Sequence, residues 1–270
     1  MKKFALMAAA LLMWGAAAFA QQHVKVQGPM GQLDTEIMKP EQLKPGQKCA
    51  AVILMHGFTG RKESPLFDEI AKGLLAKNVA VIRFDFNGHG QSEGDFKNMT
   101  VPNEIEDAKA VVKYVEGLDF VQNIALLGHS QGGVVASMTA GELGAGKIRK
   151  VVLMAPAAVL REDALRGSTM GKQYDPRNPG DVKMFGDKVL GENYIRTAQT
   201  LPIFKTAGQY IGPVMMIHGT YDVVVPCTFS EYYSYVYKNS KLQFIDGADH
   251  GFSKHIPEAA TFAVDFLTKF

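Results

Sequence analysis

The chain has 270 residues, of which 47% are hydrophobic and 21% charged, and its 29 basic residues nearly balance 27 acidic ones. This length suits one domain with a sizeable core, and a near-neutral chain without basic clusters excludes nucleic acid as the expected partner. The only two cysteines, Cys49 and Cys227, are too few for a disulfide framework. The sequence leaves their pairing open and favours two free thiols.

Residues 1–20 have the pattern of a signal peptide. Lys2 and Lys3 precede a short apolar run that ends in Ala18-Phe19-Ala20, a small-x-small cleavage pattern. An uncleaved membrane anchor is the alternative, but the run is short for a bilayer. Charges interrupt every later apolar run, so we expect no membrane association once the signal is removed. The mature chain, residues 21–270, is therefore expected to be exported, either to the periplasm or to the medium.

Strand-like and helix-like segments alternate along the mature chain, which is typical of an α/β fold with a mostly parallel central sheet flanked by helices. Periodicity predicts strands over residues 24–26, 33–38, 50–55, 79–84, 123–127, 150–154, 214–218 and 242–245, the first two as a hairpin. It predicts helices over residues 66–77, 102–117, 131–143, 229–237 and 257–270.

The regular alternation stops at Pro156. Residues 156–212 are richer in Gly, Pro, Asn and charge, and the sheet pattern resumes only at Val214. A stretch of this length is too long for a plain loop in a compact domain. We therefore expect a folded insertion, a lid, within a single domain spanning residues 21–270.

The strongest local motif is Gly128-His129-Ser130-Gln131-Gly132. It directly follows a predicted buried strand and opens a predicted helix, which is the context that a G-x-S-x-G nucleophile elbow requires. The alternative is a glycine-rich turn with an idle serine, which the position between strand and helix disfavours. Ser130 is therefore the candidate nucleophile.

A serine nucleophile needs a base, and the base needs an anion that fixes its tautomer. His250 follows the last predicted strand and Asp222 follows the strand over residues 214–218, so each lies at the carboxyl end of a strand. The order Ser, Asp, His also fits this kind of elbow. Competing residues, which we expect to be structural or badly placed, are His129, His218, His255, Asp246 and Asp249.

The oxyanion formed by serine attack must be met by preorganised N–H donors. One is expected from the residue after the nucleophile, Gln131. The other is expected from the loop His56-Gly57-Phe58-Thr59-Gly60, with the Phe58 N–H as the donor and Gly57 allowing close backbone approach. An ordinary strand-to-loop turn is the alternative for this loop.

Other patterns point away from cofactors. The segment Asn87-Gly88-His89-Gly90 is glycine-rich but lacks both phosphate-binding spacings. The histidines and acids show no paired metal-ligand spacing. We expect neither a metal nor a cofactor.

Four segments together resemble the bacterial cinnamoyl (feruloyl) esterases, a family with the α/β-hydrolase fold. They are residues 56–60, residues 83–90, the elbow and residues 247–250, and the similarity runs through nearly the whole mature chain. The resemblance implies release of ferulic, p-coumaric or caffeic acid from plant cell-wall sugar esters or from chlorogenic acid. It also implies that the insertion covers the acyl pocket.

The resemblance further implies that Asp163 and Tyr194 contact the phenolic end of the acyl group. Met170 stands where the family often has a glutamine. From the residues alone, Asp163 and Tyr194 in an otherwise apolar part of the insertion could give a slot with a polar far end, or could be surface polarity.

The sequence therefore predicts a two-step serine esterase whose partner is a small-molecule or oligosaccharide hydroxycinnamate ester. A short-chain acyl or acetyl esterase of the same fold is the nearest alternative, and a hydrolase of lipid or peptide is more distant. A non-catalytic binding protein of this fold is the alternative of another class, and the complete set of Ser130, Asp222 and His250 speaks against it. A homodimer stays open.

Overall fold

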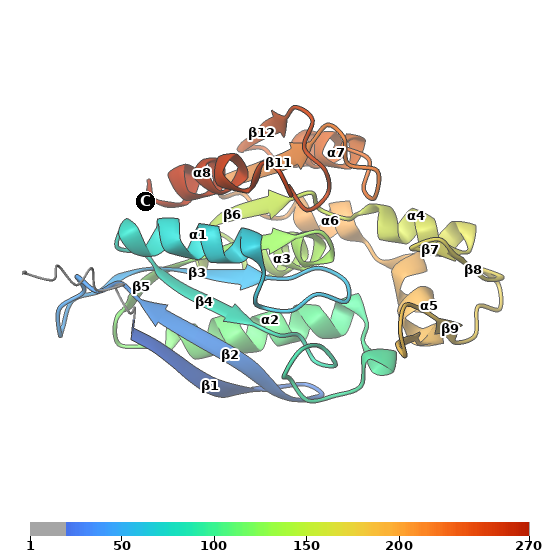
Figure 1. Ribbon diagram of the computed structural model, residues 1–270, viewed down its shortest axis with the longest axis horizontal. Helices are drawn as coiled ribbons and strands as arrows, with labels where there is room; N and C mark the ends of the chain where they lie inside the picture. Colours follow the sequence, from blue (N-terminus) through green and yellow to red (C-terminus); the bar gives the residue numbers. More distant parts are fainter. Residues whose placement is uncertain (1–19, 270) are drawn as a thin grey trace, which may run out of the picture.

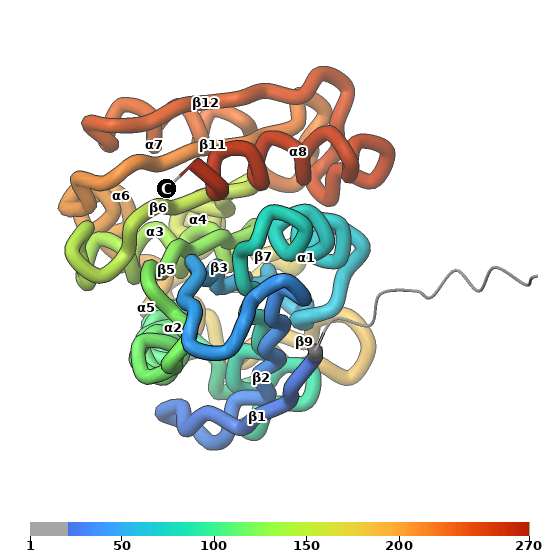
Figure 2. Tube along the Cα trace, turned by 90° about the vertical axis from the view of Figure 1, so that its left-hand side faces the viewer, coloured from blue at the N-terminus to red at the C-terminus, as the bar shows by residue number. Residues whose placement is uncertain are grey.

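The computed structural model describes residues 20–269 of the chain (Figures 1 and 2). The predicted signal peptide, residues 1–20, lies outside the described residues except for Ala20, with which the first strand begins. No helix within residues 20–269 is long and apolar enough to cross a membrane.

An eight-stranded sheet forms the centre of the molecule, in the order β1-β2-β4-β3-β5-β6-β11-β12. β1 and β2 form the predicted antiparallel hairpin, β2 pairs antiparallel with β4, and all further pairs are parallel. The strands are β1 (Ala20–Gly28), β2 (Gly31–Lys39), β3 (Cys49–Met55), β4 (Ala80–Phe84), β5 (Val121–His129), β6 (Ile148–Met154), β11 (Val214–Gly219) and β12 (Ser240–Ile245). The predicted α/β-hydrolase fold, a mostly parallel sheet flanked by helices, is confirmed.

Helices cover both faces of this sheet, as Figure 2 shows. One face carries α1 (Pro65–Ala76) and α8 (Ile256–Leu267), which pack on each other. The other carries α2 (Val101–Glu116), α3 (Gln131–Leu143), α6 (Ile203–Ala207) and α7 (Thr228–Val236). A 3-10 turn, η1 (Phe96–Asn98), precedes α2.

Alternating side chains of each central strand feed the two cores. In β3, Ile53 belongs to the core under α2 and α3, whereas Val52 and Leu54 belong to the core under α1 and α8. All three are fully buried, which explains why this strand is continuously apolar in sequence. Burying one such side chain contributes about 1.5–3 kcal/mol.

The segment between β6 and β11 is folded. It contains α4 (Val159–Arg166), the two-stranded sheets β7 (Ser168–Thr169) with β8 (Lys172–Gln173) and β9 (Val182–Lys183) with β10 (Val189–Leu190), α5 (Glu192–Thr200) and α6. In Figure 1 α4 and α5 lie at the right, beyond the tips of the β3 and β6 arrows. The insertion therefore borders the carboxyl edge of the sheet, where open α/β sheets build their sites.

Candidate active site

Ser130 occupies the sharp turn between β5 and α3. Its backbone has φ 58° and ψ −124°, a conformation that is costly for a residue with a side chain. Two hydrogen bonds to neighbouring segments, besides those within α3, hold it there: the Ser130 N–H donates to the Met154 carbonyl at 2.9 Å, and the Ser130 carbonyl accepts from the Ala157 N–H at 3.0 Å. The turn is thus fixed by β6 and the start of the insertion.

The glycines of the motif are required by space. A Cβ on Gly128 would lie 2.0 Å from the Gly132 carbonyl oxygen, and a Cβ on Gly132 would lie 2.2 Å from the Met55 carbonyl oxygen. Both distances are far inside van der Waals contact. The elbow therefore packs directly on the end of β3, and any side chain at either position would push it away.

The structure brings the three predicted catalytic residues together. His250 Nε2 lies 2.9 Å from Ser130 Oγ, and His250 Nδ1 lies 2.7 Å from Asp222 Oδ2. The Asp222 carboxyl is fully buried, whereas 19% of the His250 side chain is exposed. A hydroxyl, an imidazole and a buried carboxylate in this sequence can activate the serine as a nucleophile.

Asp222 is held as a charged acceptor. Its Oδ1 accepts from the Val224 and Val225 N–H groups at 2.9 and 2.8 Å. Burial works to raise the pKa of the Asp222 carboxyl, but hydrogen bonds from His218 and His250 outweigh burial and hold that pKa well below its usual range. The carboxylate stays ionised and can stabilise a protonated His250.

Three of the competing residues, His129, Asp246 and Asp249, have other partners. His129 Nε2 lies 2.8 Å from the His250 carbonyl oxygen, so it supports the backbone of the base. Asp249 accepts from the Ser253 N–H at 2.8 Å, and Asp246 accepts from the Thr220 hydroxyl at 3.0 Å. Neither acid contacts the His250 ring.

His218 is the competitor with a larger part than the sequence indicated. It is fully buried, and its Nε2 lies 3.1 Å from Asp222 Oδ2 and 2.9 Å from the Val225 carbonyl oxygen. Because a carbonyl only accepts, Nε2 carries a proton, and Nδ1 lies 2.7 Å from the Ser230 hydroxyl. Its position four residues before Asp222 is the one sequence signal of this contact.

The loop after β3, residues 56–60, lies against the nucleophile. A Cβ on Gly57 would lie 2.8 Å from Ser130 Cβ, as close as the sequence analysis expected. The Gly57 carbonyl accepts from the Gly60 N–H at 2.9 Å and from His56 Nδ1 at 2.9 Å. In a planar trans peptide the following N–H points the opposite way. The Phe58 N–H therefore points away from Gly60 and His56, which bind the Gly57 carbonyl of the same peptide.

Two N–H groups stay free for a ligand. Within residues 20–269, the backbone N–H groups of Phe58 and Gln131 donate to no protein acceptor. Burial lowers the pKa of His56 to about 4, so its ring is neutral, and the Phe86 N–H donates to its Nε2 at 3.1 Å. The proton therefore sits on Nδ1, where it bonds the Gly57 carbonyl. Both N–H groups are therefore available to donate to an oxyanion, and that role stays a prediction.

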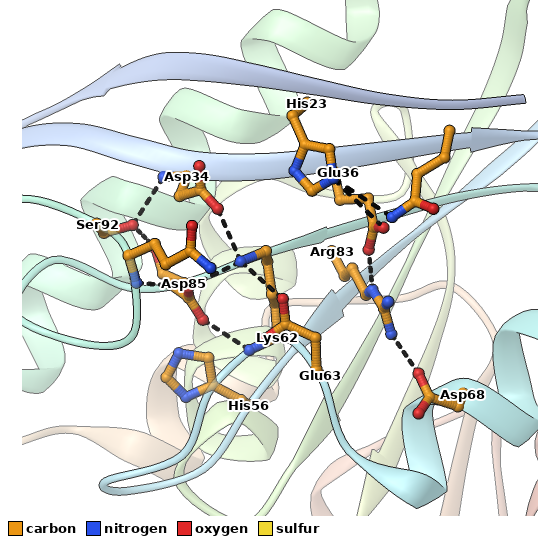
Figure 3. A network of polar contacts seen from close by, with 12 residues as sticks. His23, Asp34, Glu36, His56, Lys62, Glu63, Asp68, Arg83, Asp85 and Ser92 are labelled. Carbon is orange, nitrogen blue, oxygen red and sulfur yellow. Dashed lines mark hydrogen bonds and ion pairs between the residues drawn. The ribbon is translucent and has the colours of Figure 1, made fainter.

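A buried lysine ties this loop to the sheet, and the sequence analysis missed it (Figure 3). Lys62 Nζ lies 2.7 Å from Asp34, 3.1 Å from Asp85 and 2.9 Å from Glu63. The Lys62 N–H also donates to Asp85 at 2.6 Å. Burial works to lower the pKa of Lys62, but the three carboxylates raise it above its usual value. Arg83 forms a neighbouring cluster with Glu36 and Asp68.

A pocket opens beside Ser130 under the insertion. This inner pocket is lined by Phe58, Ser130, Gln131, Ala157, Val159, Leu160, Asp163, Thr169, Met170, Tyr194, Val224 and Val225. Most of its wall is apolar, and Asp163 is its one acidic residue. Both residues that the resemblance assigned to the phenolic end, Asp163 and Tyr194, therefore lie on the pocket that contains the candidate nucleophile.

Tyr194 and Asp163, the two residues that the resemblance assigned to the phenolic end, already have partners. The buried Tyr194 hydroxyl donates to Gln131 Oε1 at 2.7 Å, and Gln131 Nε2 donates to Glu104 Oε2 at 2.8 Å. Burial raises the pKa of Glu104 well above its usual value, which favours the neutral form of that carboxyl. Asp163 pairs with Arg166 at 2.5 Å, and 24% of its side chain is exposed.

Cys49 and Cys227 are free thiols. Within residues 20–269, no group of three or more His, Cys, Asp and Glu side chains could hold a metal ion.

Comparisons with known proteins find a matching family, related sequences and related structures. The family described as serine aminopeptidase S33 matches residues 46–173. Est1E from Butyrivibrio proteoclasticus, solved with ferulic acid bound, is 32% identical, with a TM-score of 0.86 over 90% of this chain and 97% of Est1E. Human serine hydrolase BPHL is 24% identical over 82% of this chain and 80% of the relative.

A further relative is the uncharacterized protein YfhR from Escherichia coli O157:H7, which is 25% identical over 78% of this chain. The match spans 66% of YfhR, just under two thirds of its length.

Proposed function

We propose that this chain releases hydroxycinnamic acids from plant-derived esters. It belongs to the α/β-hydrolase superfamily and is a serine hydrolase of the esterase and lipase type. The observation that carries the proposal is the inner pocket, in which the candidate nucleophile Ser130 and the polar residues Asp163 and Tyr194 share one mostly apolar wall. The ferulic acid bound to Est1E, a protein with 32% identity to this chain, supports it.

The first step forms an acyl-enzyme. Ser130 Oγ attacks the ester carbonyl carbon while its proton moves to His250 Nε2, and the oxyanion accepts from the Phe58 and Gln131 N–H groups. The bond to the alcohol oxygen then breaks as His250 returns the proton to that oxygen. The alcohol leaves, and the acyl group stays on Ser130.

The second step releases the acid. Water attacks the acyl carbon and gives a proton to His250, and the bond to Ser130 Oγ breaks as the serine recovers a proton. Asp222 keeps its charge throughout and stabilises the protonated imidazole. Both steps balance without a redox partner, so this chemistry needs no cofactor.

The pocket chemistry fits a flat acyl group with a hydroxylated end. Phe58, Leu160 and Val224 offer apolar contact to a ring and its propenoyl chain. The Tyr194 hydroxyl donates to Gln131 but keeps a lone pair, so it can accept from a phenol while Asp163 accepts from another. The insertion would then act as the lid of the acyl site.

The setting of the reaction is part of the same proposal. Residues 1–20 would direct export to the periplasm or the medium, and residues 21–270 would act as one domain on small or oligosaccharide esters. These conditions suit soluble fragments of plant cell walls.

A second candidate function is a short-chain acyl or acetyl esterase. The inner pocket beside Ser130 has a volume of only about 40 Å³. A narrow pocket favours a small acyl group. Both candidates share the triad and differ only in acyl preference.

Two measurements test the proposal. A fluorophosphonate probe should label the wild-type protein and not Ser130→Ala, and labelling of both would exclude Ser130 as the nucleophile. The values of kcat/KM for methyl ferulate, methyl caffeate, p-nitrophenyl acetate and p-nitrophenyl octanoate then rank the acyl groups. Methyl ferulate and methyl caffeate should exceed octanoate clearly, and a preference for octanoate would overturn the aromatic assignment.

A further inference from the structure

A second cleft lies along the β3 loop, residues 56–60, and its lining shares no residue with that of the inner pocket. This outer cleft is lined by His56, Gly57, Thr59, Gly60, Arg61, Glu63, Ser64, Phe67 and His129. Its wall differs in character from that of the inner pocket, because it combines charged, hydroxyl and imidazole side chains. The proposed chemistry so far gives it no part.

Two residues of the outer cleft, Gly57 and His129, lie beside the reacting centre. These residues directly precede Phe58 and Ser130, which line the inner pocket. A Cβ on Gly57 would lie 3.3 Å from Ser130 Oγ. The His129 ring lies 4.9 Å from the His250 ring between centroids. The outer cleft thus lies next to the candidate nucleophile and base, from which Gly57 and His129 of its own lining separate it.

An ester has two halves, and they leave the carbonyl carbon in different directions. With the acyl half in the inner pocket, the alcohol half extends away from it, toward the base that protonates its oxygen. We propose that the outer cleft binds the alcohol half of the substrate and selects alcohols that carry hydroxyl groups and a carboxylate. This inference rests on the proposed esterase function and adds a specificity site to it.

Arg61 is the feature that selects a carboxylate. Its side chain is exposed at the cleft, and it makes no ion pair or hydrogen bond with any residue from 20 to 269. The Glu63 carboxylate also lines the cleft, and it lies 2.9 Å from the Lys62 ammonium, which it shares with Asp34 and Asp85. A free guanidinium matches a carboxylate with two parallel N–H donors.

Two hydroxyl side chains would serve the neutral part of the alcohol. Ser64 Oγ accepts from the Phe67 N–H at 3.2 Å as the cap of α1 and keeps its own proton to donate. Thr59 is half-buried and has φ 58°, so its side chain projects from a tight turn of the β3 loop. Together with Arg61 they offer spaced donors for a polyol bearing an acid.

The test compares three caffeate esters, those of methanol, glucose and quinate, on the wild type and Arg61→Gln. The quinate ester carries the carboxylate, and the glucose ester carries only hydroxyls. We expect Arg61→Gln to lower the ratio of kcat/KM for the quinate ester to that for the methyl ester about three- to tenfold, as for one partly exposed charge contact. Arg61→Lys should lose less, and 0.5 M NaCl should lower the wild-type ratio.

Arg149→Gln is the matched control, since Arg149 is exposed at the amino end of β6, at the opposite edge of the sheet. It should leave the ratio unchanged. An unchanged ratio in Arg61→Gln would overturn the outer cleft as the site of the carboxylate, and an equal fall for the glucose ester would overturn the selection of charge.

Failure of the hydroxycinnamate proposal gives a different result. In that case the wild type hydrolyses p-nitrophenyl acetate and none of the caffeates. The same comparison is then made with the acetate esters of methanol, glucose and quinate, and the ratio still tests the outer cleft.

Discussion

His218 Nε2 lies 3.1 Å from Asp222 Oδ2, the same oxygen that faces His250 Nδ1 at 2.7 Å. One carboxylate oxygen therefore accepts hydrogen bonds from two imidazoles, that of the fully buried His218 and that of His250, which contacts the nucleophile. The buried ring is held in place by two further contacts, with the Ser230 hydroxyl and the Val225 carbonyl. The hydrogen bond that His218 donates to Asp222 weakens the stabilisation of a protonated His250 by that carboxylate.

Replacing His218 by Gln tests this division. With a weaker donor on Asp222, the carboxylate stabilises a protonated His250 more strongly, so the acid limb of the kcat/KM profile should move upward by roughly half a pH unit or more. Profiles from pH 5 to 9 measure the shift. His255→Gln, in the loop before α8, should leave the profile in place, and a stability loss in His218→Gln without a moved limb would contradict this role.

Asp222→Asn should nearly abolish activity. An amide in place of the carboxylate removes the charge that stabilises protonated His250 and disturbs its tautomer, and we expect kcat to fall on the order of 10⁴-fold. Steady-state hydrolysis of p-nitrophenyl acetate measures it. Asp246→Asn and Asp249→Asn change the two competing acids, which do not touch the His250 ring, and each should retain activity within about threefold of the wild type. If either variant lost as much activity as Asp222→Asn, the residue replaced there would be the carboxylate that supports His250.

Asp107 should make stability depend on pH. Burial raises the pKa of this carboxyl to about 7 from 3.8, although the Asn87 N–H works to lower it. Between these two values the folded protein holds a proton that the unfolded chain has released, so stability falls as pH rises. Asp107→Asn cannot ionise, and its unfolding free energy relative to the wild type should rise by about 2–4 kcal/mol between pH 4 and 8.

Urea unfolding at several pH values measures this difference. The amide has its own packing cost because Asp107 Oδ1 has no hydrogen-bond partner within residues 20–269, so the slope with pH is the test. The exposed Asp119→Asn is the control and should show no such slope. A difference that stays constant with pH would show that Asp107 is charged in the folded state.

Gly128→Ala should destabilise the protein by more than about 3 kcal/mol or prevent folding, because its Cβ would lie 2.0 Å from the Gly132 carbonyl oxygen. Thermal unfolding of purified protein measures the effect. Gly146→Ala, where a Cβ would meet no atom within 4 Å, should change stability little. Equal stability of the two variants would mean that the elbow can shift without cost.

The sequence predicts what depends on local pattern. The buried strand before Ser130, the glycines that clear its turn and the two loops that carry Asp222 and His250 each leave a signature in a few neighbouring residues. Strand and helix positions follow from periodicity, and their ends differ from the structure by a few residues.

Contacts between distant segments leave no such signature. Lys62 meets Asp34 and Asp85 only because β2 and β4 lie side by side, and Glu104 reaches Gln131 only because α2 packs on α3. His218 looked like an ordinary strand residue because its partner is defined by the fold of the next loop. Asp163 and Tyr194 were assigned from a resemblance, since spacing alone does not place an insertion over a pocket.

Gln131 joins two duties in one residue. Its backbone N–H is the proposed oxyanion donor, while its side chain bridges Glu104 in the scaffold and Tyr194 in the insertion. An evolving or engineered protein therefore cannot exchange the insertion as an independent module. A new insertion without a hydroxyl at the Tyr194 position would leave the Gln131 amide oxygen unpaired beside the nucleophile. Substrate range and catalytic rate are coupled traits in this scaffold, and changes that broaden one are expected to require compensation in the other.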